Sequence, residues 1–310
     1  MKTRFPILLL LILLQGIGAV NAQLKNGMNT VLWKIEHPGS TNISYILGTN
    51  HLFGEEWVKS HPKIDTLVSS SAIFICESLH SIDTAALTKL QHNLRSEKRT
   101  SKELFKEDFE VVNTYFKEKT GSGLVENVDN SSEPRIGVIW RIYDYLLGEI
   151  AAKRHIKISG NGDPLDKSLL ESATIQKKIT VGLDPIEVVN SVYTSANLID
   201  EYCSFIIDLI KIDNHDLLVA DTRLGQQSYD RILFGMETYD KAKYDYNFTS
   251  KPTKAAMLEK RNKLWMKKLP DLIKSSNCFI AVGAKHLESR IGIIPELQKM
   301  GYVISPIDLN

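Results

Sequence analysis

Two short segments of this sequence share a pattern that can place a histidine at the end of a β-strand. Each has an apolar run, a glycine and, three residues after the glycine, a histidine: residues 43–47 with Gly48 and His51, and residues 278–282 with Gly283 and His286. The glycine permits close backbone approach or an unusual turn directly after the strand. A histidine on such a loop can serve as a metal ligand.

A third apolar run, at residues 72–76, ends directly before Glu77. If the three runs are neighbouring parallel strands, their carboxyl ends meet at the edge where open α/β sheets bind ligands, and His51, Glu77 and His286 converge there. Two imidazoles and a carboxylate suit a divalent transition metal such as Mn, Co or Zn, which would acidify a bound water. Glu77 would then be a metal ligand or the general base.

A structural role for the same residues stays open at this point. A lone histidine more often packs or forms a hydrogen bond than binds metal, and Glu77 could cap a helix or join an ion pair. The sequence contains no His-Glu-x-x-His helix, no Gly-x-Ser-x-Gly elbow and no Walker-type phosphate loop. The repetition of the strand–glycine–histidine pattern is the feature that favours a metal site.

The elements that must position these residues alternate between strand and helix, which predicts an α/β fold with a mixed sheet flanked by helices. Periodicity predicts strands at residues 30–35, 43–47, 72–76, 156–158, 179–183, 278–282 and 302–304, and helices at 57–70, 254–274 and 292–299. The first two strands should form a hairpin. The middle of the chain reads as mostly helical, which predicts a helical insertion, or cap, at about residues 81–250.

The first 22 residues have the pattern of a signal peptide. A basic start containing Lys2 and Arg4 precedes an apolar run at residues 6–14, and small residues at 20–22 allow cleavage after Ala22. The alternative, an uncleaved anchor helix, is disfavoured because the run is too short to span a bilayer. We therefore expect an exported protein, periplasmic or secreted, whose mature part is residues 23–310 and which has no stable transmembrane anchor.

Charge and cysteine content narrow the classes of partner. The formal net charge is +1, and removal of Lys2 and Arg4 with the signal peptide leaves −1, so nothing attracts the mature chain to nucleic acid or to an acidic membrane. Peptides or other small molecules are the expected substrates. Cys76, Cys203 and Cys278 give neither a disulfide framework nor a zinc knuckle, although one pair could form in an oxidising compartment.

The sequence resembles the TraB/GumN family, which includes the animal Tiki proteins, over most of the mature chain. The similar residues fall into three blocks in the family's order: Leu32-Trp33 with Tyr45 to His51; Asp166, Leu169 and Ala173 with Val181 to Asp184; and Glu259 to Asn262 with Trp265, Phe279 to Leu287, Gly292, Leu297 and Gly301-Tyr302. The last block is the most similar. The chain departs from the family at Asp184, where a glutamate commonly follows Gly-Leu, and this puts any role of that carboxylate in doubt.

The resemblance implies that His51 and His286 are the motif histidines, that Glu77 is the acidic site residue and that Arg261 is the basic one. Family members are described as metal-dependent hydrolases, and the Tiki proteins as proteases. We therefore expect an exported metal-dependent hydrolase, and specifically a metalloprotease, in which Arg261 stabilises developing negative charge. Two alternatives stay open: Arg261 could form a purely structural ion pair, and the protein could be a non-catalytic one that sequesters a peptide or another ligand in the same crevice.

Overall fold

The computed structural model describes residues 29–79, 88, 97–158, 164–185, 187–188, 196–213, 235–251 and 255–309. The expected signal peptide at residues 1–22 lies outside these residues and stays a prediction.

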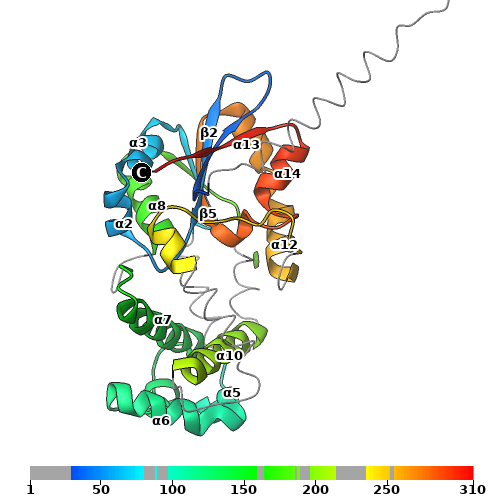
Figure 1. Cartoon of the computed structure of the whole chain (residues 1–310). Helices are drawn as coiled ribbons and strands as arrows, with labels where there is room; N and C mark the ends of the chain where they lie inside the picture. The colour runs from blue at the N-terminus through cyan, green and yellow to red at the C-terminus, as the bar shows by residue number, and fades with distance from the viewer. Residues whose placement is uncertain are drawn as a thin grey trace, which may run out of the picture.

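Within the described residues, six strands form one mixed sheet in the order β4-β3-β5-β2-β1-β6 (Figure 1). The strands are β1 (Leu32–Glu36), β2 (Ile43–Thr49), β3 (Ile73–Cys76), β4 (Ile179–Gly182), β5 (Cys278–Gly283) and β6 (Val303–Ile307). The strands β4, β3, β5 and β2 are parallel to one another, whereas β1 pairs antiparallel with both β2 and β6. The predicted mixed sheet and its opening hairpin are confirmed.

Helices cover both faces of the sheet because its central strands are apolar on both sides (Figure 1). Successive residues of a strand point to opposite faces, so Ile46 and Ile280 join one buried cluster while Leu47 and Phe279 join the other. The first cluster packs against α12 (Ala255–Trp265), α13 (Leu269–Ser275) and α14 (Ile293–Lys299). The second packs against α2 (Glu55–Ser60), α3 (Pro62–Ser70) and α8 (Leu165–Ile175).

A separate helical lobe lies at one end of the molecule (Figure 1). Its helices are α5 (Ser101–Phe105), α6 (Phe109–Thr120), α7 (Arg135–Lys153) and α10 (Ala196–Asp213). The short turn η1 (Lys106–Asp108) lies between α5 and α6, and η2 (Val125–Asp129) lies between α6 and α7. Their apolar residues form a hydrophobic cluster of their own. The bounds of the insertion, expected at about 81–250, stay a prediction, and within that range α8 and β4 pack with the sheet.

Two predicted helices are each divided in two. The one expected at 57–70 breaks at His61, which has φ −127° and ψ 68° between α2 and α3. Pro62 follows it, and a proline disfavours the helical conformation of the preceding residue. The one expected at 254–274 breaks into α12 and α13 at a turn over residues 266–268, and Pro270 lies in the first turn of α13.

The strand predicted at residues 156–158 is wrong. This segment instead follows the C-terminus of α7: His155 has a positive φ of 56°, and the N–H of Ile156 donates to the carbonyl of Ala151 at 2.9 Å. Ile156 is buried in the cluster of the helical lobe. The apolar alternation therefore reflects packing rather than strand pairing.

All three cysteines are free and buried. Burial raises the pKa of Cys76 and Cys203 to about 12, so these thiols are poor nucleophiles. Among the described helices, none has both the length and the apolarity needed to cross a bilayer.

Candidate functional site

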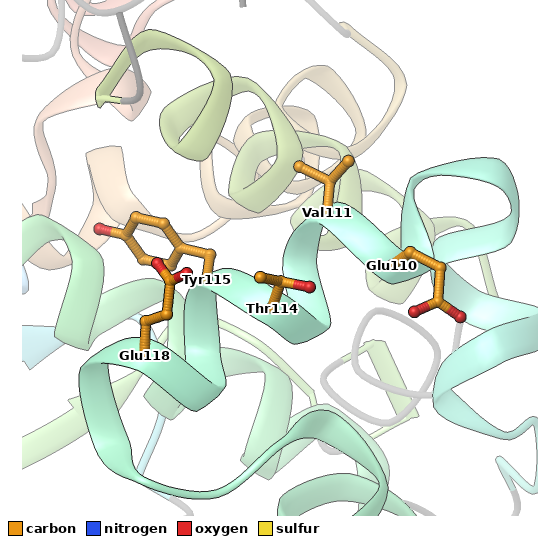
Figure 2. Close-up of a pocket in the computed structure, with 5 residues that line it drawn as sticks. All are labelled: Glu110, Val111, Thr114, Tyr115 and Glu118. Carbon is orange, nitrogen blue, oxygen red and sulfur yellow. The ribbon is translucent and has the colours of Figure 1, made fainter. Parts of the chain in front are cut away.

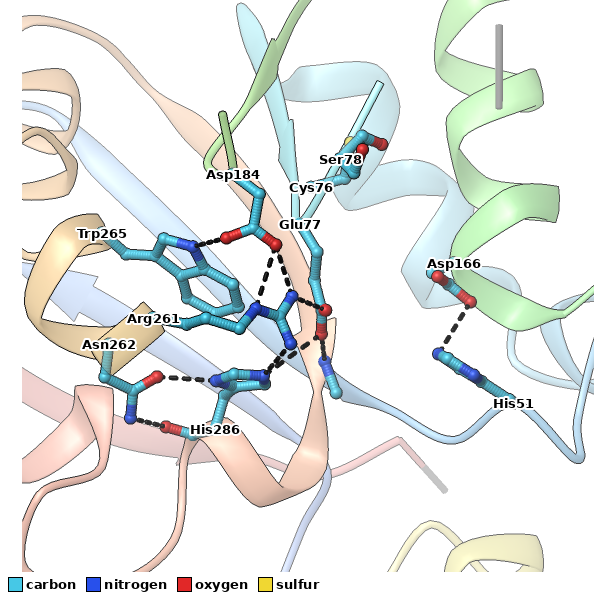
Figure 3. Close-up of polar contacts among 11 residues, drawn as sticks. His51, Cys76, Glu77, Ser78, Asp166, Asp184, Arg261, Asn262, Trp265 and His286 are labelled. Atoms are coloured by element: carbon cyan, nitrogen blue, oxygen red, sulfur yellow. Dashed lines mark hydrogen bonds and ion pairs between the residues drawn. The ribbon is translucent and has the colours of Figure 1, made fainter. Parts of the chain in front are cut away.

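The order of the central strands brings three sequence segments to one edge of the sheet. β5 lies between β3 and β2, and both pair with it in parallel, with Cys76 opposite Ala281 and Thr49 opposite Gly283. The residues that follow these strands therefore share the carboxyl edge, as the sequence predicts. Figure 3 shows Glu77, His286 and His51 there, with Arg261 reaching in from α12.

Glu77 follows β3 directly and lies against the end of β5. Its Oε1 accepts the backbone N–H of Gly283 at 2.7 Å, and its Oε2 accepts a hydrogen bond from Nη2 of Arg261. A Cβ at position 283 would lie 3.1 Å from Glu77 Oε1, so glycine lets the carboxylate approach the backbone here. This close approach is a physical reason for the glycine in the second motif.

Arg261 joins two carboxylates and an imidazole. Its Nε and Nη2 donate to Oδ2 of Asp184 at 3.0 and 2.6 Å, and its Nη1 lies 3.0 Å from Nε2 of His286. The side chain of Asp184 is only 3% exposed, and its other oxygen accepts the indole N–H of Trp265 at 2.6 Å. The role left in doubt by the sequence is therefore assigned: Asp184 anchors Arg261.

His286 is held in one orientation by its surroundings. It lies in the short helical turn η3 (Ala284–His286), is 3% exposed and packs against the ring of Trp265 at a centroid distance of 4.2 Å. Its Nδ1 lies 2.6 Å from Oδ1 of Asn262, whose amide nitrogen donates to the carbonyls of His286 and Ile291. Because the amide oxygen faces the ring, Nδ1 carries the proton and Nε2 carries the lone pair.

The charges of this cluster follow from burial and from its contacts. Burial lowers the pKa of His286 to about 4, so the imidazole is neutral at neutral pH. Burial opposes ionisation of Glu77, but His286, which becomes protonated in acid, the charge of Arg261 and the N–H of Gly283 lower its pKa to about 2. The nearby carboxylates Glu77 and Asp184 raise the pKa of Arg261 against the effect of burial. The site thus combines a neutral imidazole, an ionised carboxylate and a permanent cation.

His51 lies at the same edge but apart from this cluster (Figure 3). Its side chain is 63% exposed, and its Nε2 lies 3.5 Å from Oδ1 of Asp166 on α8. The structure gives it no hydrogen bond or ion pair with Glu77, Arg261 or His286, all of which are described. The structure therefore brings Glu77, Arg261 and His286 into contact and leaves His51 beside them.

The donor atoms of the cluster fit a divalent metal in part. An unprotonated Nε2, whose partner Nδ1–H is fixed by an oxygen, is the usual state of a metal-binding histidine. Nε2 of His286 lies 3.8 Å from Oε1 of Glu77, whereas two ligands of a tetrahedral ion are about 3.4 Å apart when each is about 2.1 Å from it. Among the described residues, no group of three or more His, Cys, Asp or Glu side chains is arranged around one ion position. The sharing of one ion by His51, Glu77 and His286 stays a prediction.

Gly48 of the first motif is needed for packing between the two motifs. A Cβ at this position would lie 2.1 Å from the hydroxyl of Tyr246 and 3.1 Å from both Cα of Ala284 and Cδ1 of Leu287. Ala284 and Leu287 belong to the loop that carries His286. The first motif therefore needs its glycine so that the second motif can pack against it.

Several residues of the cluster around Arg261 cannot be recognised as site residues from the sequence. Asn262 and Trp265 appear there only as part of the family resemblance, although they lie one and four residues after Arg261 on α12. Residues four apart share a helix face, so that spacing is the signal that places Trp265 beside Arg261. Nothing in the spacing connects Asp184, 77 residues before Arg261, with this face. That connection depends on β4 pairing with β3.

A hollow lies elsewhere, on α6 of the helical lobe (Figure 2). It has a volume of about 370 Å³ and is lined by Glu110, Val111, Thr114, Tyr115 and Glu118. All five residues come from one helix, so in the described part of the chain no second element brings a complementary group to it. In Figure 1, α7 and α10 lie between α6 and the sheet. The hollow therefore does not belong to the site at the strand ends.

Comparison with known proteins gives one finding. The model of the TraB/PrgY/gumN family matches residues 31–306. Neither a curated protein nor a solved structure gives a match. The matched range contains both Gly-x-x-His segments, Glu77, Asp184 and Arg261. The chain belongs to the TraB/PrgY/gumN family.

Proposed function

We propose that this chain is an exported metal-dependent hydrolase that cleaves peptide bonds. The observation that carries the proposal is the buried, neutral imidazole of His286, whose unprotonated Nε2 faces the ionised carboxylate of Glu77 at 3.8 Å. Both groups lie at the carboxyl edge of parallel strands, where α/β proteins bind their ligands. His286, Glu77 and His51 would hold the metal.

Each residue of the cluster has a distinct part in such a reaction. A bound divalent ion would polarise a carbonyl and acidify a water molecule. Glu77, ionised at neutral pH, can accept a proton from that water. Arg261 keeps its charge and is fixed by Asp184, so it can stabilise negative charge that develops on the substrate oxygen. Asn262 keeps the proton on Nδ1 of His286 and the lone pair on Nε2.

Arg261 also limits access to His286 in the present arrangement. Its Nη1 lies 3.0 Å from Nε2, so a metal ligand bond at Nε2 requires this contact to be given up. Asp184 holds Nε and Nη2 of the same guanidinium independently of Nη1. Arg261 can therefore stay anchored in the site after Nη1 leaves the imidazole.

A peptidase assay tests the proposal directly. The mature chain, residues 23–310, would be stripped with a chelator and assayed against a broad peptide library with Mn²⁺, Co²⁺ or Zn²⁺ supplied. We expect cleavage that chelator abolishes and metal restores. Glu77→Gln should abolish cleavage, while Glu259→Gln, which removes an exposed carboxylate paired with Lys263 on α12, should leave it unchanged. Absence of cleavage under every metal would contradict the hydrolase assignment.

The contacts of Arg261 favour a second candidate, a non-catalytic protein that sequesters a peptide or other small ligand. The guanidinium contacts both Glu77 and Nε2 of His286, so a polar ligand could form hydrogen bonds with these groups without turnover. Such a protein would bind peptides from the library and release them intact, and Arg261→Met would weaken that binding. Recovery of intact peptide with the parent chain is the result that separates this candidate from the hydrolase.

Export has its own test. The basic start and the apolar run predict that the protein isolated from its native host begins at Gln23. N-terminal sequencing of the exported fraction checks this. Recovery of the chain from a cytoplasmic fraction with Met1 retained would contradict export without affecting the site.

A further inference from the structure

A second histidine–carboxylate pair lies at the same edge of the sheet. Asp166 is in the first turn of α8, and its Oδ1 lies 3.5 Å from Nε2 of His51. Figure 3 shows the two side chains facing one another, beside the cluster around Arg261. In the sequence, Asp166 is noted only as one of the residues that resemble the family, and the resemblance assigns no role to it.

The buried oxygen of Asp166 lacks a hydrogen bond. Oδ1 is inaccessible to solvent, and no described residue donates a hydrogen bond to it. A buried acceptor without a donor destabilises a fold, and a charged one more than a neutral one. The 3.5 Å separation from His51 exceeds the usual length of an N–H···O hydrogen bond. This oxygen therefore needs a partner that none of the described residues supplies.

Helix capping does not account for this oxygen. An acidic residue in the first turn of a helix commonly interacts with the free N–H groups there. In α8, however, the N-cap residue is Pro164, no side chain caps the helix, and Oδ1 of Asp166 accepts no backbone N–H. The position of this oxygen is thus explained by what it faces, which is Nε2 of His51.

The two pairs have similar separations but different counter-charges. Nε2 of His286 and Oε1 of Glu77 are 3.8 Å apart, and Nε2 of His51 and Oδ1 of Asp166 are 3.5 Å apart. Both separations are close to the roughly 3.4 Å expected for two ligands of one tetrahedral ion. Arg261 neutralises the first pair, whereas no described Lys or Arg forms an ion pair with Asp166.

We propose that Asp166 is a fourth metal-binding residue, which pairs with His51 so that the site consists of two histidine–carboxylate pairs. The proposal rests on the function proposed above and extends it by one residue. Two imidazoles and two carboxylates form a donor set suited to Mn²⁺, Co²⁺ or Zn²⁺. The buried oxygen of Asp166, which accepts no hydrogen bond from a described residue, is the feature that attracts the ion towards His51.

Calorimetric titration of the chelator-treated mature chain with Mn²⁺ tests this. Asp166→Asn preserves the shape and removes the charge, and we expect it to weaken Mn²⁺ binding by at least about 10-fold, the lower end of losses seen around metal sites. The matched control is Glu171→Gln, which removes an exposed carboxylate of the same helix that pairs with Lys167. The control should bind Mn²⁺ as the parent does.

Thermal unfolding of the metal-free proteins separates a ligand from a structural residue. Asp166→Asn should not melt below the parent without metal, because it removes an unsatisfied charge, and it should lose most of the stabilisation that Mn²⁺ gives the parent. A lower melting temperature without metal, together with parent-like Mn²⁺ affinity, would overturn the role of Asp166. If His51→Ala still weakened binding, the proposed function would survive that result. A parent chain that binds no metal would overturn both.

Discussion

The two Gly-x-x-His segments follow adjacent parallel strands, yet their histidines lie in different environments. His286 is buried, packs on Trp265 and is held at Nδ1 by Asn262. His51 has a side chain that is 63% exposed, and its partner at 3.5 Å is Asp166. The part of the candidate site that contains His286 and Arg261 is therefore fixed before any ligand binds, and we call it the fixed half. The part that contains His51 and Asp166 is exposed, and we call it the open half.

The difference comes from what packs on each loop. The loop of His286 is covered by α12, which contributes Arg261, Asn262 and Trp265 from neighbouring turns of one helix. The loop of His51 is a turn in which Oδ1 of Asn50 accepts the N–H of Leu52, and it faces α8. The four-residue motif thus places a histidine at the end of a strand. Whether the side chain of that histidine is fixed in one orientation depends on helices that are distant in sequence.

The largest effect should come from removing the cation of the fixed half. Arg261→Met leaves Glu77 and Asp184 without their shared partner, and breaking a buried ion pair in this way destabilises a protein by about 3–5 kcal/mol. Urea denaturation followed by circular dichroism measures the loss. Lys263→Met, which removes an exposed cation of the same helix, should change stability by less than about 1 kcal/mol. Equal losses in both variants would show that Arg261 does not organise the site.

The two histidines should differ in their contribution to stability. His286→Ala leaves Oδ1 of Asn262 without its donor and opens a cavity beside Trp265, which together should cost about 2–4 kcal/mol. His51→Ala changes an exposed side chain and should alter stability by no more than about 0.5 kcal/mol in metal-free protein. Denaturation of both variants under chelating conditions checks the contrast. A loss for His51→Ala as large as that for His286→Ala would contradict the division into a fixed and an open half.

Replacement of the glycine of the first motif should disturb the packing between the two motifs. Gly48→Ala brings a methyl group against Tyr246, Ala284 and Leu287 and should destabilise the fold by about 1–3 kcal/mol. Tyr246→Phe removes the nearest atom, so the double variant should lose less than the sum of the single losses. Gly137→Ala on α7 is the control, because its added methyl group meets nothing. Additive losses would show that the hydroxyl of Tyr246 is not what the glycine accommodates.

Acid should weaken the fixed half. The pKa of His286 is about 4 in the folded protein and about 6.5 in the unfolded protein. As the pH drops, this side chain therefore binds a proton in the unfolded protein before it does so in the folded one, and the free energy of unfolding falls between about pH 6.5 and 4. The pKa of Glu77 is lowered to about 2, so its contribution is lost between about pH 4.5 and 2. Between about pH 6.5 and 4 we expect the parent to lose roughly 1–3 kcal/mol of its free energy of unfolding, and we expect His286→Gln to show little of this loss. An identical pH profile in both proteins would contradict the assigned state of His286.

The strand ends could be predicted from the sequence, because each apolar run stops at a polar residue or a glycine. The expectation that His51, Glu77 and His286 follow strands that end at one edge of the sheet is therefore confirmed. The contacts of this cluster could not be predicted, since Asn262 reaches His286 only through the packing of α12, and Asp184 reaches Arg261 only through the pairing of β4 with β3. The failed strand at 156–158 has a similar cause: apolar alternation does not distinguish a paired strand from a chain segment that packs on a helix.

The central claim is that both motif histidines bind the same metal ion. Titration of the mature chain, carrying ¹⁵N-labelled histidine, with Co²⁺ tests it most directly, with resonances assigned from His51→Ala and His286→Ala. The account predicts that the ring signals of His51 and His286 shift or broaden together and that both changes are complete at one equivalent of Co²⁺. A response of His286 alone, or responses of the two rings at different equivalents, would contradict it.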